Sequence, residues 1–479
     1  MTNNISIKKA VIVNALGKYS SVAFQLVFSA ILSRLLTPAE FGVVTVMNVF
    51  VIFFELFSDL GIGTAIVQNK ELDNRDINAI FTFTIAFGIT LATIFCGFSF
   101  GIAEYYGKYI YIRLGIIFSI SIMLTSFNVV PNALLMKNRC FASVSIRTVI
   151  SCVVSYIVAI ILAILGFSYY SLVIRSVVMS IILLIWNVVA SKINYRFVFD
   201  LKSVRKIWSY SAFQLGATMI NYFQRNLDNL LVGKHMGEEL LGYYNKSYTL
   251  MQYPVTYLSQ VITPVLHPIL SEHQKDKQYI FDQYLMILQL LSLIGILVTG
   301  VFSSASEEII TIMFGNQWKE AVAPLHVISF SIWVQMLTGT VGCIMQSLGD
   351  TKNLFKMCTI SLAISVIGII IGIRLGSITK LAYCIVIIYW IHFFIYFSVL
   401  MRKGFNKKMH YFLSSIKIDF LLLLIVSIVG MILYNYFFIE NVLLSFTIKS
   451  CVIMLVYVAL LFLSKRNKVF VTLLRRSNK

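Results

Sequence analysis

The sequence predicts an all-α, polytopic membrane protein with about fourteen transmembrane helices. Of its 479 residues, 59% are hydrophobic and only 12% are charged, and the mean hydropathy is +0.86. A soluble chain keeps about a quarter of its residues charged, so most of this surface must face lipid. The apolar residues also occur in runs of roughly 20, the length of helix that crosses a bilayer core. No polar stretch is long enough to form a separate soluble domain.

Fourteen such runs follow one another along the chain. They lie near residues 11–33, 42–67, 79–103, 109–130, 142–165, 168–190, 209–233, 241–269, 280–303, 321–348, 354–373, 378–401, 415–435 and 443–464. The first run follows Lys8 and Lys9 and resembles a signal peptide. It contains Lys18, however, and lacks a small-residue cleavage site, so we expect a retained helix.

The positive charges predict how the helices are oriented. A net charge of +19 in a soluble protein would suggest a nucleic-acid partner, but here the cations lie in short segments between apolar runs. With the N-terminus in the cytoplasm, 26 of the 39 Lys and Arg residues fall in cytoplasmic segments, eight on the opposite side and five within runs. This asymmetry follows the positive-inside rule. We therefore expect both termini in the cytoplasm and no nucleic-acid partner.

An internal repeat with an offset of 200 residues divides the chain. Six positions correspond without a gap: Asn14, Ser21, Gln25, Ser29, Arg34 and Gly42 match Gln214, Asn221, Arg225, Asn229, Lys234 and Gly242. In each copy the polar residues recur at helical spacing and form one polar face on an apolar helix. Six helices separate the copies, so both run in the same direction, as in parallel repeats related by an axis along the membrane normal.

The repeat gives the expected domain organisation. We predict a six-helix lobe at 1–190, a basic cytoplasmic linker at 191–208 and a second six-helix lobe at 209–401. An additional helix pair and a basic cytoplasmic tail occupy 402–479 and stand outside the repeat.

The two polar helix faces predict a shared cavity, because polar faces in a membrane are unfavourable unless they meet water or one another. Lys18, and Arg225 with Asp228, are the clearest residues to line it. A charge at mid-membrane costs roughly 2.5–3.5 kcal/mol on insertion scales, and binding an anionic group is one reason to keep it. Two alternatives stay open: Asp228 neutralises Arg225 one turn away, or Lys18 extends to the membrane interface.

Other charges within the runs have separate interpretations. Arg175 lies deep in its run and is a further cavity candidate, whereas Arg147 lies near the cytoplasmic boundary, where anchoring is favoured. The position of Lys449 suggests no function. Glu55 and Asp59, one turn apart, either take up a proton or sodium ion for coupling or pair with Lys18. The glycines of the segment DLGIG at 59–63 predict close helix packing or a bend.

Motifs for catalysis and metal binding are absent from the sequence. There is no GxxxxGK[ST] phosphate loop, the seven cysteines are scattered without a CxxC pair, and no carboxylate or histidine cluster resembles an acid–base site. We therefore expect no catalytic residue, metal or cofactor. A polysaccharide polymerase or lipid-using glycosyltransferase would need large outer loops or clustered acidic and basic side chains, which this chain lacks.

Four short motifs resemble a known transporter family. The segments SRLLTPAEFG at 33–42, DLGIGTAIVQ at 59–68, DNLLVG at 228–233 and LGYY at 241–244 are similar to those of the Wzx-type flippases. These are polysaccharide transporters of the multidrug/oligosaccharidyl-lipid/polysaccharide exporter superfamily. The resemblance implies two six-helix lobes forming a V-shaped cavity, plus an extra helix pair. It also implies alternating access that flips oligosaccharide repeat units on undecaprenyl pyrophosphate to the outer leaflet, for cell-surface polysaccharide synthesis.

The resemblance also implies site residues, partners and a location. On that resemblance Lys18, Arg34, Arg175 and Arg225 are candidates to hold the pyrophosphate, for which arginine's forked donors are well suited. The full set of substrate-binding candidates is Lys18, Gln25, Arg34, Arg175, Asn221, Arg225 and Asp228. The expected location is the bacterial cytoplasmic (inner) membrane, with membrane lipids and polysaccharide polymerase machinery as further partners. A monomer is expected because each chain contains both lobes. The alternative is a small-molecule or multidrug exporter, whose cavity would tend to be acidic.

Overall fold

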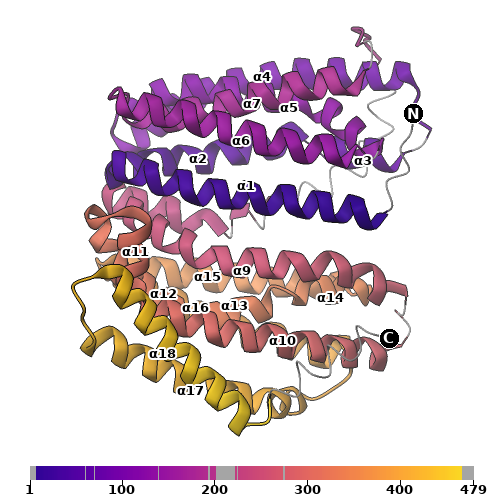
Figure 1. Ribbon diagram of the computed structural model, residues 1–479. Coiled ribbons are helices and arrows are strands. Elements are labelled where there is room, and N and C mark those ends of the chain that lie inside the picture. The colour runs from indigo at the N-terminus through magenta and orange to yellow at the C-terminus, as the bar shows by residue number, and fades with distance from the viewer. Residues whose placement is uncertain are drawn as a thin grey trace. The chain divides into compact units, whose positions relative to one another are not determined.

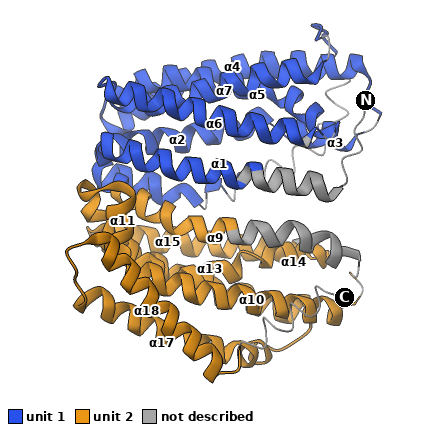
Figure 2. Ribbon diagram, in the orientation of Figure 1, with its two compact units in different colours: residues 1–242 blue, residues 243–479 orange. Residues whose placement is uncertain are grey.

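The computed structural model describes residues 7–59, 61–69, 71–138, 140–192, 195–200, 219, 222–223, 225–272, 274 and 276–466. For residues 7–16, 18, 141, 258–272 and 351 it describes the backbone alone. Every regular element in this described part is helical, which confirms the all-α prediction. The chain forms two compact units, unit 1 at 1–242 and unit 2 at 243–479 (Figure 2).

Unit 1 is a bundle of long helices (Figure 1). They are α1 (Ile7–Leu35), α2 (Pro38–Asp59), α3 (Ile62–Gln68), α4 (Asn74–Tyr106), α5 (Ile110–Lys137), α6 (Phe141–Ile164) and α7 (Tyr169–Ser191). Residues 225–235 are also helical, and α9 (Glu238–Glu272) begins in unit 1. In the bundle α4 packs along α5, α1 along α6, and α5 and α6 both pack against α7.

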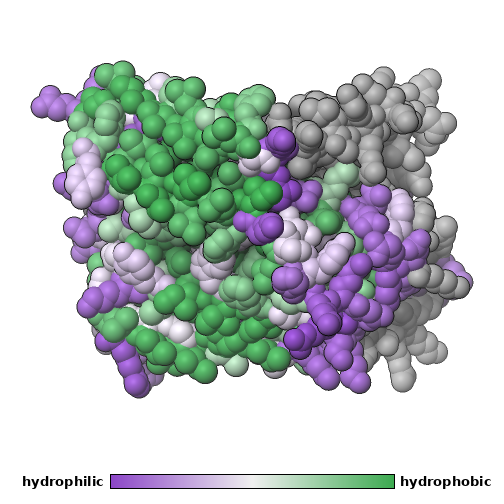
Figure 3. All heavy atoms as spheres, turned by 90° about the horizontal axis from the view of Figure 1, so that it is seen from below, coloured by the Kyte–Doolittle hydropathy of each residue, from purple (hydrophilic) through white to green (hydrophobic). Residues whose placement is uncertain are grey.

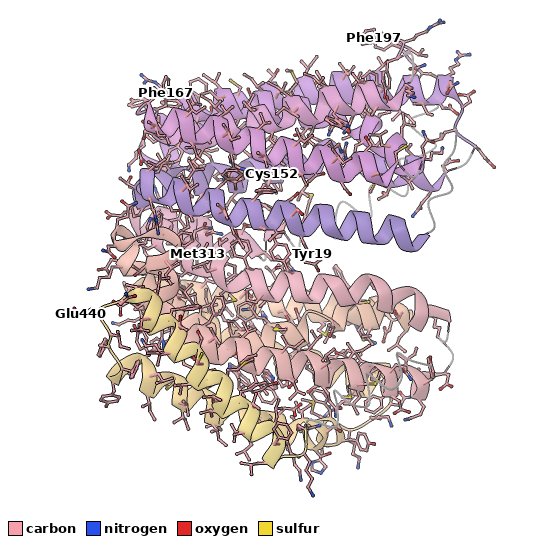
Figure 4. The ribbon with its side chains drawn as sticks, viewed as in Figure 1. Tyr19, Cys152, Phe167, Phe197, Met313 and Glu440 are labelled. Atoms are coloured by element: carbon pink, nitrogen blue, oxygen red, sulfur yellow. The ribbon has the colours of Figure 1, made fainter. Side chains whose placement is uncertain are left out.

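Local signals in the sequence set the helix ends in unit 1. Asp73 and Asp76 form a capping box at the start of α4, in which each side chain accepts a hydrogen bond from the other's backbone N–H. Gly107 ends the same helix with φ 75°, a conformation that glycine adopts without steric cost. The α6–α7 turn, with Phe167, lies at one end of the bundle and Phe197 at the other (Figure 4).

The second expected span is one apolar segment with a break. Helix α2 ends at Asp59, α3 begins at Ile62, and Gly61 between them has φ 69°. The bend predicted from the glycines is therefore confirmed. Ile62, Ala65 and Ile66 of α3 pack in an apolar cluster with residues of α4 and α5, so burial of this face stabilises the short helix after the break.

Unit 2 contains the rest of α9 and all later helices (Figure 1). These are α10 (Lys277–Ser304), α11 (Ser306–Phe314), the 3₁₀ helix η1 (Asn316–Ala321), α12 (Val322–Ser329), α13 (Ile332–Thr338), α14 (Val341–Ser347), α15 (Thr351–Arg374), α16 (Ile378–Val399), the π-helical turn η2 (Leu400–Gly404), α17 (Met409–Tyr436) and α18 (Val442–Leu463). Helix α10 is central and contacts α12, α13, α17 and α18.

One expectation for unit 2 needs correction. The segment near 321–348 is not one straight span, because α12, α13 and α14 are separate and the chain bends by 54° between Ser329 and Ile332. Here the hydroxyls of Ser329 and Ser331 donate to carbonyls three residues back, and such bonds compete with a regular helix. The connection that follows α10 contains helix α11, whose Ile310 and Phe314 are buried.

The helices are suited to a membrane. In the described part of the chain, ten helices are long and apolar enough to cross a membrane, or eleven if the bent pair counts as one span. Three expected spans fall partly on residues whose side chains lie outside the described part of the chain: 11–33, 209–233 and 241–269. The count of fourteen therefore stays a prediction. On the face of unit 2 seen in Figure 3, hydrophobic residues form a broad band with hydrophilic residues at its ends, as a lipid-facing surface requires.

The compact units divide the chain at a different place from the expected lobes. Unit 1 includes residues 225–235, because Tyr106 Oη donates to Leu230 O at 3.0 Å and a Cβ added at Gly233 would lie 2.9 Å from a methyl of Val46. Residues 201–218 lie outside the described part of the chain. The lobe boundaries 1–190, 191–208, 209–401 and 402–479 therefore stay predictions.

Candidate functional site

A close helix crossing joins the beginning of α2 to the beginning of α9 within unit 1. A Cβ added at Gly42 would lie 1.7 Å from the Glu238 backbone oxygen, and one added at Gly242 would lie 2.0 Å from the Pro38 oxygen. Real Cβ atoms essentially never approach closer than 3.0 Å. Only glycine therefore fits at either position, and the two glycines are the pair that the 200-residue repeat matches.

Polar contacts reinforce this crossing. Lys108 Nζ and Tyr111 Oη donate to the two carboxylate oxygens of Glu238, at 2.7 and 3.0 Å. Burial raises the pKa of Glu238, but the hydrogen bonds and the Lys108 charge outweigh burial and bring the pKa below its ordinary value. The ionised carboxylate thus ties α9 to the α4–α5 turn.

A second cluster brings two predicted site residues together. The Arg175 guanidinium of α7 stacks over the Tyr156 ring of α6, with 4.6 Å to its centroid. The Tyr156 hydroxyl also hydrogen-bonds the Gln25 side chain of α1. Cys152, one turn before Tyr156, donates weakly to Ser21 O, and so lies between α6 and α1 (Figure 4). Gln25 and Arg175 therefore both contact the Tyr156 side chain, as members of one site would.

Helix α5 carries a polar stripe along the interior of unit 1. Its members recur at helical spacing and each contacts a polar group of another helix: Ser121 with Ser180 at 3.1 Å, Thr125 with Glu55 at 3.4 Å, Asn128 with Asn187 at 2.6 Å, and Asn132 with Arg147 at 2.6 Å. Partners thus come from α2, α6 and α7. The sequence-based search followed charges and overlooked this stripe, although Ser, Thr and Asn at helical spacing could have revealed it.

Arg147 differs from its expected role. It was expected to anchor the helix at the membrane boundary, which requires an exposed guanidinium, yet the residue is only 6% exposed. Its Nη2 donates to Asn132 Oδ1, and Nε and Nη1 have no hydrogen-bond partner within the described part of the chain. The exposed guanidinium that anchoring requires is therefore not found, whereas the position of Arg147 near the cytoplasmic boundary stays a prediction.

The two predicted coupling residues have different surroundings. Glu55 is partly buried and accepts a hydrogen bond from Thr125. Asp59 is exposed at the end of α2, and its Oδ1 accepts from Gly63 N at 3.3 Å, so it supports the break before α3. The alternative in which Lys18 pairs with them involves a side chain that lies outside the described residues.

The remaining predicted site residues differ in how exposed they are. Arg34 is exposed at the end of α1, and Arg225 is exposed on the helix at 225–235. Asp228 is buried, and its Oδ1 accepts from Asn229 N at 2.8 Å. The pairing of Arg225 with Asp228 stays a prediction. Asn221 lies outside the described residues.

Buried ion pairs in unit 2 were not predicted. Lys449 Nζ of α18 lies 2.6 Å from Glu308 Oε1 of α11, and Ser445 donates to the same oxygen at 2.5 Å. Arg466 Nε pairs with Asp419 of α17 at 2.8 Å. These pairs hold α17 and α18 to the rest of unit 2 and explain Lys449. In the described ranges no three His, Cys, Asp or Glu residues are grouped as a metal site requires.

The comparison with known proteins decides the family. Residues 31–323 match the family described as polysaccharide biosynthesis protein. The chain belongs to this family. The match confirms the predicted relationship to polysaccharide transporters, and it spans the α2–α9 crossing, the α5 stripe, and Tyr156 with Arg175.

Relatives and solved structures agree with this polysaccharide biosynthesis family. The teichuronic acid biosynthesis protein TuaB of Bacillus subtilis (strain 168) is 26% identical over 381 residues, which cover 78% of this chain and 77% of TuaB. The succinoglycan biosynthesis transport protein ExoT of Rhizobium meliloti (strain 1021) is 23% identical, with 77% and 74% covered. The inward closed lipid II flippase MurJ has the same fold, with a TM-score of 0.74 at 16% identity over 96% of this chain and 100% of MurJ.

Proposed function

We propose that this member of the polysaccharide biosynthesis family is a transporter rather than an enzyme. It would flip undecaprenyl-pyrophosphate-linked oligosaccharide repeat units from the cytoplasmic to the outer leaflet by alternating access. The observation that carries the proposal is the polar interior of unit 1, where Arg147 and Arg175 lie among neutral polar side chains in a bundle of membrane-spanning helices. Ionisable groups at such places mark substrate or ion pathways.

The sign of the charge favours this substrate over a cationic drug. Arginine's forked donors bind phosphate oxygens well. The positive charges of Arg147 and Arg175 would repel a cationic substrate from the interior of unit 1, unless the negative charge of Glu55 outweighed both. The names of TuaB and ExoT assign those proteins to acidic-polymer synthesis and succinoglycan transport, and MurJ is a lipid II flippase. These names support a lipid-linked sugar as substrate, and the multidrug exporter is the second candidate.

Location and orientation are part of the proposal. We infer a bacterial cytoplasmic membrane with both termini in the cytoplasm, because the 26-to-8 distribution of cations favours it. The α2–α9 crossing then lies on the outer side. A monomer, working beside polysaccharide polymerase machinery, fits a chain that carries both repeats. Glu55, which contacts the polar stripe of α5 through Thr125, is a better coupling candidate than Asp59, which supports the break before α3.

The substrate-binding residues also remain proposals. Lys18, Gln25, Arg34, Arg175, Asn221, Arg225 and Asp228 are retained as candidates. The contact of Gln25 and Arg175 with one tyrosine gives these two the strongest support.

The test follows lipid-linked oligosaccharide in cells depleted of the protein. We expect the precursor to accumulate on the cytoplasmic leaflet, wild type to clear it, and Arg175→Gln to clear it slowly. Arg113→Gln is the matched control, because Arg113 is an exposed arginine at the start of α5. If no lipid-linked sugar accumulates, the flippase proposal fails and the exporter becomes the leading candidate. Equal clearance by both variants would support transport but remove Arg175 from the site.

A further inference from the structure

Arg147 is the buried cation of unit 1 whose surroundings leave most of its hydrogen-bonding capacity unused. The residue is 6% exposed, and one bond, from Nη2 to Asn132 Oδ1 at 2.6 Å, positions its guanidinium. Nε and Nη1, which together carry three N–H groups, have no hydrogen-bond partner among the described residues. Nor does an ion pair join Arg147 to any carboxylate of that set.

Such an arrangement is unfavourable for the protein alone. Arginine stays protonated in proteins, so the positive charge persists in the bundle. An unpaired buried charge is strongly destabilising, and orphaned buried donors in a native structure call for an explanation such as an ion or ligand. A purely structural role would need only the hydrogen bond to Asn132. Glutamine, which is neutral, or lysine could donate a similar bond.

Two neutral polar atoms elsewhere in the interior of unit 1 also lack hydrogen-bond partners among the described residues. Ser145 Oγ, two residues before Arg147 on α6, is buried without a partner in the described part. So is Asn187 Oδ1, whose amide donates to Asn128 one turn from Asn132 on α5. Glu55 contacts Thr125, which is seven residues, or about 10 Å along the helix, from Asn132. Within the described part of the chain, donors without a partner at Arg147 and an acceptor without a partner at Asn187 therefore contact α5 one helical turn apart.

The other arginines considered for the pyrophosphate are less suitable in this structure. Arg175 stacks on Tyr156, and Arg34 and Arg225 are exposed. Arg147 combines burial, fixed orientation and free donors. These are the properties that make a phosphate contact both strong and specific.

We propose that Arg147 binds the phosphate group of the transported lipid. Its Nε–H and Nη1–H groups donate to phosphoryl oxygens, Asn132 orients the guanidinium, and Asn187 Oδ1 accepts a hydroxyl of the adjoining sugar. This inference rests on the proposed function and deepens it. Under the proposed orientation Arg147 lies toward the cytoplasmic side, near the start of α6, where a headgroup from the inner leaflet would first meet the bundle.

Binding by the full-length protein tests the proposal. Inorganic pyrophosphate, farnesyl pyrophosphate and glucuronate are titrated into detergent-solubilised protein, and saturable binding is measured by calorimetry. We expect both pyrophosphates to bind wild type, Arg147→Gln to raise Kd by roughly 10- to 100-fold, and Arg147→Lys to have an intermediate effect. Arg75→Gln replaces an exposed arginine in the first turn of α4; it is the charge-matched control and should match wild type.

Stability separates binding from a structural role. Removing an unpaired buried charge should leave the unliganded protein as stable as wild type or more stable, so Arg147→Gln should lose binding without losing thermal stability. Tighter binding of farnesyl pyrophosphate than of pyrophosphate identifies a lipid-borne phosphate as the ligand, and equal binding supports recognition of the phosphate alone. The proposal is overturned if neither pyrophosphate binds wild type, if glucuronate alone binds, or if Arg147→Gln binds normally.

The clearance assay in depleted cells distinguishes the two proposals. If wild type clears the lipid-linked sugar and Arg147→Gln clears it equally, transport stands and the Arg147 proposal fails. If wild type moves no lipid-linked sugar, the proposed function fails, and the binding titration still decides whether Arg147 is a phosphate site.

Discussion

Replacing Gly42 by alanine should disrupt the crossing of α2 and α9. The added Cβ would lie 1.7 Å from the Glu238 oxygen, so the two backbones would have to separate by at least 3.0 − 1.7 = 1.3 Å to reach the closest approach that real Cβ atoms show. No side-chain rotation can relieve this clash, because the oxygen belongs to the backbone and the position of an alanine Cβ is fixed by its own backbone. Overpacking of this kind costs about 1–3 kcal/mol, and we expect the upper end.

Two measurements on the purified protein report this effect. Thermal unfolding should show Gly42→Ala to be less stable than wild type, and hydrogen exchange should be faster at 238–242 although the substitution is at 42. Gly101→Ala is the matched control, because a Cβ there meets nothing within 4 Å, and alanine is the better helix former by roughly 0.5–1 kcal/mol. If Gly42→Ala matches this control in both measurements, the reasoning about the crossing is refuted.

The pKa of Glu238 lies below its ordinary value of 4.5, so its ionised form stabilises the fold above that pH and the contribution disappears as the pH falls through the folded-state pKa. Glu238→Gln should therefore unfold at a lower temperature than wild type at pH 7. Its free energy of unfolding should be lower by about 1 kcal/mol, given the partly exposed partner, and this difference should vanish in acid. A pH-independent difference would contradict this reasoning. Lys449→Met should cost about 3–5 kcal/mol, because Glu308 would stay buried without its cation. Denaturant unfolding should show partial recovery when Glu308→Gln is added, and no recovery would mean that Lys449 acts through packing. Tyr156→Leu should slow clearance of the lipid-linked sugar because Arg175 loses a cation–π contact of about 0.5–2 kcal/mol. Tyr156→Phe keeps the ring and should stay close to wild type, and equal defects in the two variants would assign the effect to the hydroxyl.

The sequence could predict what depends on local chemistry. Runs of about 20 apolar residues predicted most spans, and the glycines after Asp59 predicted the break before α3. By contrast, the pairing of Lys449 with Glu308 joins distant parts of the chain. No periodicity within a single sequence shows which buried cation meets which carboxylate, so such pairs emerge only from the fold.

The candidate site was predictable only in part, for a related reason. Charged residues in apolar runs stand out, so Arg175 was found, and its contact with Tyr156 agrees with an interior position. The burial of Arg147 was not predicted, because its nearness to the cytoplasmic boundary was taken to mean exposure. Helix α5 provides Asn132 beside it, and a neutral asparagine gives no signal comparable to a charge. Packing against a neighbouring helix, rather than position along its own helix, decided the burial of this arginine.

The crossing explains which parts of the repeat are identical and which are only similar. Pro38 and Glu238 are also 200 residues apart, so Gly42 meets Glu238 as Gly242 meets Pro38. Such reciprocal contacts are the mark of a two-fold relationship between the elements. To the reciprocal contact itself Pro38 and Glu238 contribute only backbone oxygens, so this contact does not require the same side chain in both copies. The glycines contribute the absence of a Cβ, which no other residue can supply, and hence both copies keep it.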